Sequence, residues 1–108
     1  MVNNSLHLDT IFHCLADPTR RDILGAILVQ DRTVSELVGR YNISFPAVSR
    51  HLKVLEKANL IRKQKNGRVY MVSLAPETLK EADEYLEQYR RMWQSRHDKL
   101  EILLKEGE

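Results

Sequence analysis

Positive charge is distributed unevenly along this chain of 108 residues. Residues 40–70 combine eight lysine and arginine side chains with one carboxylate, Glu56, so the segment has a net charge of +7 while the whole chain has +2. The cations are Arg40, Arg50, Lys53, Lys57, Arg62, Lys63, Lys65 and Arg68. Cationic side chains gathered in this way attract a polyanion, because binding releases its condensed counterions. The charge pattern therefore indicates nucleic-acid binding rather than a merely solvated surface.

A helix is expected to present the first of these cations. Ser44 is predicted to cap it, and Pro46 lies in its first turn, where a missing N–H has no cost. Val48, Leu52 and Leu55 recur at helical spacing and should be buried. The side chains left exposed are then Phe45, Pro46, Ser49, Arg50 and Lys53.

A shorter helix precedes this one, and Thr33-x-x-Glu36 is the capping box that begins it. The two helices, residues 33–57, are predicted to form a helix–turn–helix whose second helix enters the DNA major groove. Arg50 can read guanine or hold a phosphate, and Ser49 can bond a base edge or a phosphate. Phe45 and Pro46 can contact a thymine methyl group, whereas Ser44 is expected mainly to cap the helix.

His51 lies on the flank of the same helix. Two interpretations remain open for it: a contact to a phosphate or base, or a half-buried histidine.

A basic hairpin follows, over residues 60–74. Asn59 is expected to end the preceding helix in a left-handed conformation. Leu60 to Gln64 and Val69 to Leu74 are predicted strands, joined through Asn66-Gly67, since both of these residues tolerate positive φ. The tip carries Lys65, Asn66 and Arg68, which are expected to contact the DNA backbone or the minor groove.

The last helix is predicted over residues 76–105, roughly 40 Å long. One heptad seam runs along it, interrupted by Arg96. Its members are Leu79, Ala82, Leu86, Tyr89, Trp93, Arg96, Leu100 and Leu103. A seam of this length exceeds what one small core can cover, so we expect part of it to pack on a second copy of the chain. The alternative is that the helix folds wholly onto its own core.

Length and composition fit one domain, mainly α with a small β-hairpin. No apolar run approaches a membrane span and no secretory signal is recognised, so we expect a cytoplasmic protein. A single cysteine, Cys14, excludes an internal disulfide. An enzyme is not expected, because the chain has no Gly-rich phosphate loop and no nucleophile with a base. RNA binding is not expected, because the predicted strands lack exposed aromatic pairs on which bases could stack. A degenerate winged helix that binds a partner protein remains an alternative.

Three stretches together resemble the winged helix–turn–helix repressors of the ArsR type: ADPTRRDIL, TVSELVGRYNISFPAVSRHLKVLEKANLI and GRVYMVSL. The resemblance spans nearly the whole chain. It implies a homodimer held by the first helix, near residues 9–16, and the last. It also implies repression of a promoter through an inverted-repeat operator. The positions it assigns to DNA contact are Phe45, Pro46, Ser49, Arg50, His51 and Arg68. The dimer-interface positions are Ile11, Phe12, Leu86, Tyr89, Trp93, Leu100 and Leu103.

Metal sensing is the alternative within that family. Metal-sensing relatives use a Cys-x-Cys pair early in the motif, where residues 36–40 here contain no soft ligand. Others use ligands on the last helix, where Glu84 and His97 are suitably spaced but Leu86 and Leu100 take the other places. We therefore expect no cofactor and no metal. The C-terminal YLEQYRRMWQSRHDKLEILL resembles a metal-independent branch, and this resemblance implies autoregulation. The sequence assigns no small-molecule or metal inducer.

Overall fold

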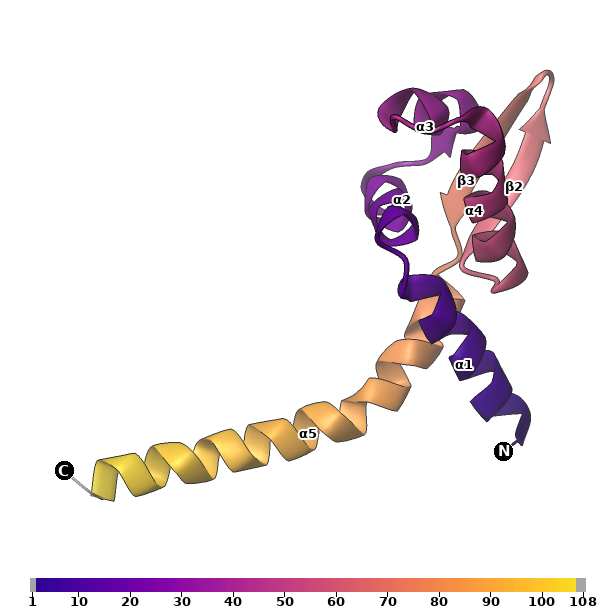
Figure 1. Ribbon diagram of the computed structural model, residues 1–108. Helices are drawn as coiled ribbons and strands as arrows, with labels where there is room; N and C mark the ends of the chain where they lie inside the picture. The colour runs from indigo at the N-terminus through magenta and orange to yellow at the C-terminus, as the bar shows by residue number, and fades with distance from the viewer. Residues whose placement is uncertain (1, 107–108) are drawn as a thin grey trace.

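Four helices and a three-stranded sheet enclose one apolar core, and a fifth helix runs away from it (Figure 1). This arrangement comes from a computed structural model that describes the backbone of residues 2–106 and the side chains of residues 7–105. The elements are α1 (Val2–Leu15), α2 (Pro18–Val29), β1 (Arg32–Thr33), α3 (Val34–Arg40), α4 (Phe45–Lys57), β2 (Ile61–Asn66), β3 (Val69–Leu74) and α5 (Pro76–Glu106). In the described residues, no helix combines the length and apolar character needed to cross a membrane.

The helix–turn–helix begins at the caps that the sequence predicts. The Thr33 hydroxyl accepts the N–H of Glu36 at 3.0 Å and starts α3, and the Ser44 hydroxyl accepts the N–H of Ala47 at 3.3 Å and starts α4. One detail differs from the usual capping box, in which the carboxylate accepts a backbone N–H of the N-cap residue. Here the Glu36 carboxylate accepts from the Thr33 hydroxyl at 3.2 Å.

Asn59 ends α4 in a Schellman motif, as predicted. Its φ is 59°, the left-handed conformation that asparagine tolerates. The N–H of Leu60 donates to the carbonyl of Leu55 and the N–H of Asn59 to that of Glu56, both at 3.0 Å. Leu60 is fully buried beside Leu55 in the core, so this motif fixes both the end of α4 and the start of the hairpin.

The core confirms the predicted inward face of α4, because Val48, Leu52 and Leu55 are all buried. The first helix begins at Val2, earlier than the expected start near residue 9, and Asp9 lies exposed within it. In α2, Ala26 and Ile27 are buried in the core, whereas Leu28 is 69% exposed.

The sheet has a strand that the sequence analysis missed. Arg32–Thr33 pairs with β3, giving the order β1-β3-β2, all antiparallel. The hairpin turn is also shifted by one residue from the prediction. Asn66 pairs with Val69, so the two-residue loop is Gly67-Arg68, and Gly67 alone has a positive φ, 69°. Glycine at the first loop position fits a type II′ turn, and the first strand extends through Asn66.

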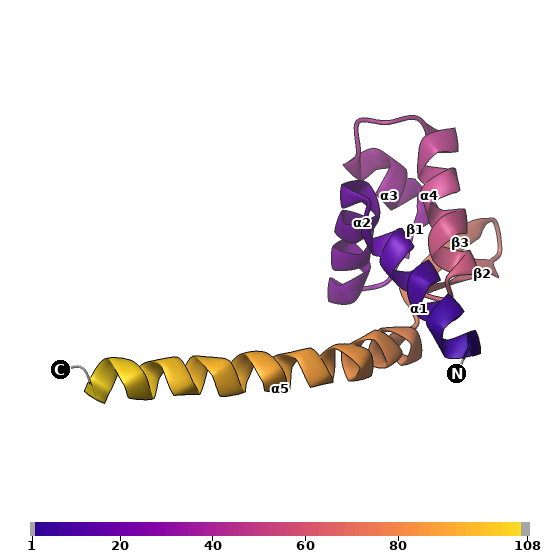
Figure 2. The same cartoon turned by 60° about the horizontal axis from the view of Figure 1, so that its bottom comes forward.

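The long helix α5 is anchored only at its first turns. The Thr78 hydroxyl donates to the carbonyl of Asn59, and Thr78 and Ala82 are buried against the rest of the fold. Beyond these turns the helix leaves the core, as Figures 1 and 2 both show. Seam residues Leu86, Tyr89, Trp93, Leu100 and Leu103 are 40–66% exposed. The alternative in which α5 folds wholly onto its own core is therefore wrong.

One substitution pair tests the Schellman motif. Asn59→Ala is expected to lower the free energy of unfolding by about 1 kcal/mol, because alanine resists the left-handed conformation. Asn59→Gly should cause no loss, since glycine adopts a positive φ freely. Urea unfolding at one fixed protein concentration measures both. Equal losses for the two variants would mean that the asparagine side chain, and not its backbone angle, stabilises the fold.

Candidate nucleic-acid interface

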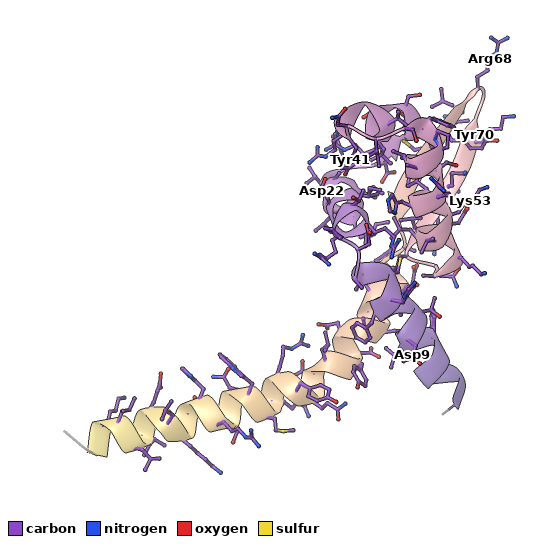
Figure 3. All side chains as sticks on the ribbon, viewed as in Figure 1. Asp9, Asp22, Tyr41, Lys53, Arg68 and Tyr70 are labelled. Carbon is purple, nitrogen blue, oxygen red and sulfur yellow. The ribbon has the colours of Figure 1, made fainter. Side chains whose placement is uncertain are left out.

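Helix α4 packs against strand β2 of the hairpin (Figure 1). Arg68 projects from the tip of the hairpin into solvent (Figure 3). Every predicted contact residue retains accessible surface, but His51 and Ser49 are only partly exposed. The exposed ones are Ser44, Phe45, Pro46, Arg50, Lys53, Lys65, Asn66 and Arg68. We call this set, with His51 and Ser49, the α4–wing surface.

Ion pairs divide the eight cations of residues 40–70 into two groups. Arg40 lies 3.6 Å from Asp22, and Arg62 lies 3.0 Å from Glu77, so carboxylates outside the segment offset these two charges. Within the described part of the chain, the other six have no ion pair. They are Arg50, Lys53, Lys57, Lys63, Lys65 and Arg68. Among the cations of residues 40–70, those without an ion pair thus lie on α4 and on the hairpin, where a polyanion could approach them.

Tyr70 organises the lysines of the hairpin. The Nζ atoms of Lys63 and Lys65 lie 5.1 Å and 5.9 Å from the centroid of its ring, within cation–π range. Tyr70 is also the direct cross-strand partner of Lys65. The sequence analysis missed this role, although the alternation of side chains along β3 could have placed Tyr70 on the face of its lysine partner.

His51 lies on the flank of α4 that faces α2. Its Nδ1 is 3.4 Å from Nη1 of Arg20 and 3.9 Å from Oδ2 of Asp17, and its side chain is 23% exposed. The half-buried interpretation of His51 is therefore correct, and a DNA contact from its remaining exposed surface stays a prediction. Arg20, Arg50 and His51 border a depression of about 280 Å³ at this junction, a basic setting suited to a phosphate.

Arg20 links three helices. Its Nε donates to the carbonyl of Cys14 at 2.8 Å and its Nη2 to that of His13 at 3.3 Å, so it satisfies the open C-terminal end of α1. Its backbone N–H donates to Asp17 at 3.0 Å, which caps α2, and its Nη1 faces His51 on α4. This role was also missed, because helical spacing alone does not indicate which cation meets the end of a neighbouring helix.

Potential metal ligands are dispersed in the described residues, where no three His, Cys, Asp or Glu side chains gather. His7 pairs with Glu81 at 2.7 Å, and His97 pairs with Glu101 at 3.3 Å and stacks on Trp93. Cys14 is fully buried, and its burial raises the pKa of the thiol. The arrangement of one chain thus offers no formed metal centre among these side chains.

An end-capped helix with free cations, beside a basic hairpin, defines the class of winged helix–turn–helix DNA-binding proteins. The chain belongs to the arsR family of bacterial regulatory proteins, whose family model matches residues 17–63. It is accordingly a DNA-binding transcriptional regulator and not an enzyme. The class and fold predicted from the sequence are confirmed.

Similar proteins include two repressors. The chain is 32% identical over 75 residues to the transcriptional repressor SdpR of Bacillus subtilis (strain 168), covering 69% of this chain and 83% of that relative. It is 33% identical over 72 residues to the arsenical resistance operon repressor of Staphylococcus xylosus, covering 67% and 69%. Among solved structures, the ArsR family transcriptional regulator RHA00566 has a TM-score of 0.76 at 34% identity, with 84% and 94% of the two chains covered.

Asp17 offers a test of the junction between α2 and α4. The N–H of Arg20 donates to its carboxylate and holds the pKa of Asp17 below its usual value. Asp17→Ala is expected to lower the free energy of unfolding by about 1 kcal/mol at pH 7, because the cap of α2 is lost. Since the folded-state pKa is depressed, this contribution is complete above the unfolded value of about 3.9 and disappears as the pH falls through the folded-state value.

Urea unfolding between pH 7 and pH 2.5 measures the free energy of unfolding of wild type and of Asp17→Ala. The difference between the two should become smaller at the acid end. Asp17→Asn is the matched control, because it retains a capping oxygen that does not titrate. A difference between wild type and Asp17→Ala that stays constant over the whole range would contradict the assignment.

Proposed function

We propose that this protein is a homodimeric repressor that binds an inverted-repeat operator in the cytoplasm. The observation that carries the proposal is that six cations without an ion pair lie close together in the chain, on α4 and on the hairpin that follows it. Repression is the activity named for the SdpR relative and for the arsenical resistance operon relative, and it supports the same activity here.

The division of contacts follows from chemistry. Arg50 and Ser49 are proposed to read base edges from α4, and Lys53 to hold a neighbouring phosphate. Lys65, Asn66 and Arg68 are proposed to fix the hairpin on the backbone or in the minor groove. The Ser44 hydroxyl oxygen accepts the N–H of Ala47 and so caps α4. A hydrogen bond from Ser44 to a DNA phosphate would therefore be donated by its hydroxyl proton.

The exposed apolar seam of α5 is the observation that supports a homodimer. Trp93 is 66% exposed and Leu103 64%, and a soluble monomer has no physical reason to leave a row of such side chains in water. Phe12 on α1 adds to this surface, since it is 36% exposed and its ring lies 5.9 Å from that of Tyr85. Ile11, in contrast, is fully buried in its own core, so the prediction that it contacts the partner was wrong.

A two-fold axis through such an interface would present two α4 helices to successive major grooves, about 34 Å apart. An inverted repeat is the DNA sequence with matching symmetry. Autoregulation is proposed on the same basis as in the sequence analysis, and it predicts such a repeat upstream of the gene for this chain. We propose regulation without a metal, because the donors Cys14, His7 and His97 are buried or held by neighbouring groups in the chain.

Arg50→Ala tests DNA reading. The variant is expected to lose operator binding, by at least tenfold in affinity, because its guanidinium supplies a charged, bidentate contact worth about 1–3 kcal/mol in each half-site. Gel shifts on an operator obtained by selection from random duplexes measure this loss, and Arg91→Ala on the far helix is the control. Wild-type affinity should also fall steeply between 50 mM and 200 mM salt. Unchanged binding by Arg50→Ala would remove Arg50 from the interface.

Trp93→Glu tests the dimer. A carboxylate placed at the centre of an apolar interface is expected to give a monomer, because burying an unpaired charge is strongly unfavourable. Sedimentation velocity measures the mass. Ser95→Glu adds the same charge two residues further along, on the opposite side of α5 from the seam, and should remain dimeric. If Trp93→Glu sediments as a dimer, the seam is not the contact between the chains.

A further inference from the structure

The tip of α4 differs chemically from the rest of the α4–wing surface, and this difference points to a particular ligand. We propose that Phe45 reads the 5-methyl group of a pyrimidine in the major groove, the methyl of thymine or of 5-methylcytosine. This inference rests on the proposed operator binding and specifies part of what the operator contains.

The N-terminal end of α4, with the loop before it, has no charged side chain. Between Tyr41 and Ser49 the chain carries no lysine, arginine, aspartate or glutamate, and the first cation of α4 is Arg50. The exposed side chains here are mainly apolar: Ile43 is 39% exposed and Phe45 is 58% exposed. Pro46, beside them, is also exposed. An uncharged, apolar tip therefore leads a surface that is otherwise cationic.

Phe45 has no packing role in the described part of the chain that would explain a large aromatic side chain at this exposed position. In the part of the chain that the structure describes, its ring makes no pairing with another aromatic ring and does not belong to the core. The Phe45 ring therefore contributes neither to the core nor to an aromatic pair within one chain. It also lies far from the α5 seam, because α4 and the free part of α5 occupy opposite parts of the molecule (Figures 1 and 2). A dimer formed along that seam would leave Phe45 exposed.

Asn42 is an exposed polar side chain, but it precedes α4, and the first turn of the helix itself offers few hydrogen-bonding groups. The Ser44 hydroxyl already accepts the N–H of Ala47, and Pro46 has no N–H to offer. Ser49 and Arg50, the first side chains able to read a polar base edge, lie one helical turn further in. Within α4, the first turn is therefore suited to an apolar feature of the DNA, while polar readout from the helix begins at Ser49.

Base pairs present one apolar feature in the major groove, the methyl group at pyrimidine C5. Thymine carries it always and cytosine only when methylated. An aromatic ring packed on this methyl removes apolar surface of both partners from water. Burying one methyl group corresponds to about a fourfold gain in affinity, and the gain applies to each half-site.

The experiment is a double-mutant cycle between the protein and the DNA. The operator selected from random duplexes is resynthesised with deoxyuridine in place of each thymidine in turn, which deletes only the methyl. Wild type and Phe45→Ala are titrated against each duplex by fluorescence anisotropy. Wild type should bind about fourfold more weakly when one particular methyl is missing. Phe45→Ala should bind more weakly overall and should not respond to that deletion.

Cytosine substitutions test whether the methyl group alone is recognised. The same thymine–adenine pair is then replaced by cytosine–guanine, with and without a 5-methyl group on the cytosine. Methylation should raise the affinity of wild type about fourfold and should not change that of Phe45→Ala. Val29→Ala, which truncates a side chain that is 77% exposed on α2, is the matched control and should respond as wild type does. Circular dichroism of Phe45→Ala should match wild type, since its ring lies outside the core.

Three results would overturn the assignment. Wild type could be indifferent to every methyl, Phe45→Ala could respond as strongly as wild type, or thymine but not 5-methylcytosine could strengthen binding. Loss of affinity in Phe45→Ala without any methyl dependence would instead indicate a wedge between base steps. Failure of wild type to select any duplex would overturn the proposed operator binding itself, which keeps the two proposals distinguishable.

Discussion

Burial of one stripe of α4 is the constraint on which the surface chemistry depends. Val48, Leu52 and Leu55 are 2% exposed or less, and together they fix the rotation of the helix about its axis. A rotation of one residue, about 100°, would exchange core and solvent positions. The Schellman motif at Asn59 then fixes where the helix ends and where the hairpin begins. Arg50 and Lys53 are therefore exposed because apolar packing on the other side of α4 fixes the helix in this rotation.

Charge counted along the sequence overstated the field of this surface. Residues 40–70 sum to +7, but Asp22 and Glu77 lie outside that segment and pair with Arg40 and Arg62. These pairs are exposed, so each adds little to stability. Their effect is spatial, because they offset positive charge away from the outward face of α4 and from the hairpin tip. What remains is a more sharply bounded cationic area than the linear charge distribution indicates.

Much of the fold could be predicted because its signals are local. Caps at Thr33 and Ser44, the left-handed Asn59 and the α4 stripe depend on residues a few positions apart. Features that depend on distant partners were missed. The strand Arg32–Thr33 exists only through β3, and Arg20 acts on α1 and α4, so neither has a local signal. The hairpin turn moved to Gly67-Arg68, because the ladder pairs Asn66 with Val69 and so uses Asn66 as a strand residue.

The contacts of Arg20 bear on how two half-sites could be read together. This residue holds the end of α1 through two carbonyls and meets His51 on α4, while α1 lies against the first turns of α5 through Phe12 and Tyr85. A helix in contact with the proposed dimer surface is thus joined to the proposed reading helix by a few directional contacts at a fixed junction. Because hydrogen bonds of this kind tolerate little change in geometry, the orientation of α4 relative to α1 is restricted. The spacing of two recognition helices would then be set mainly by the part of the α5 seam from Leu86 onward, which lies outside the core of the chain.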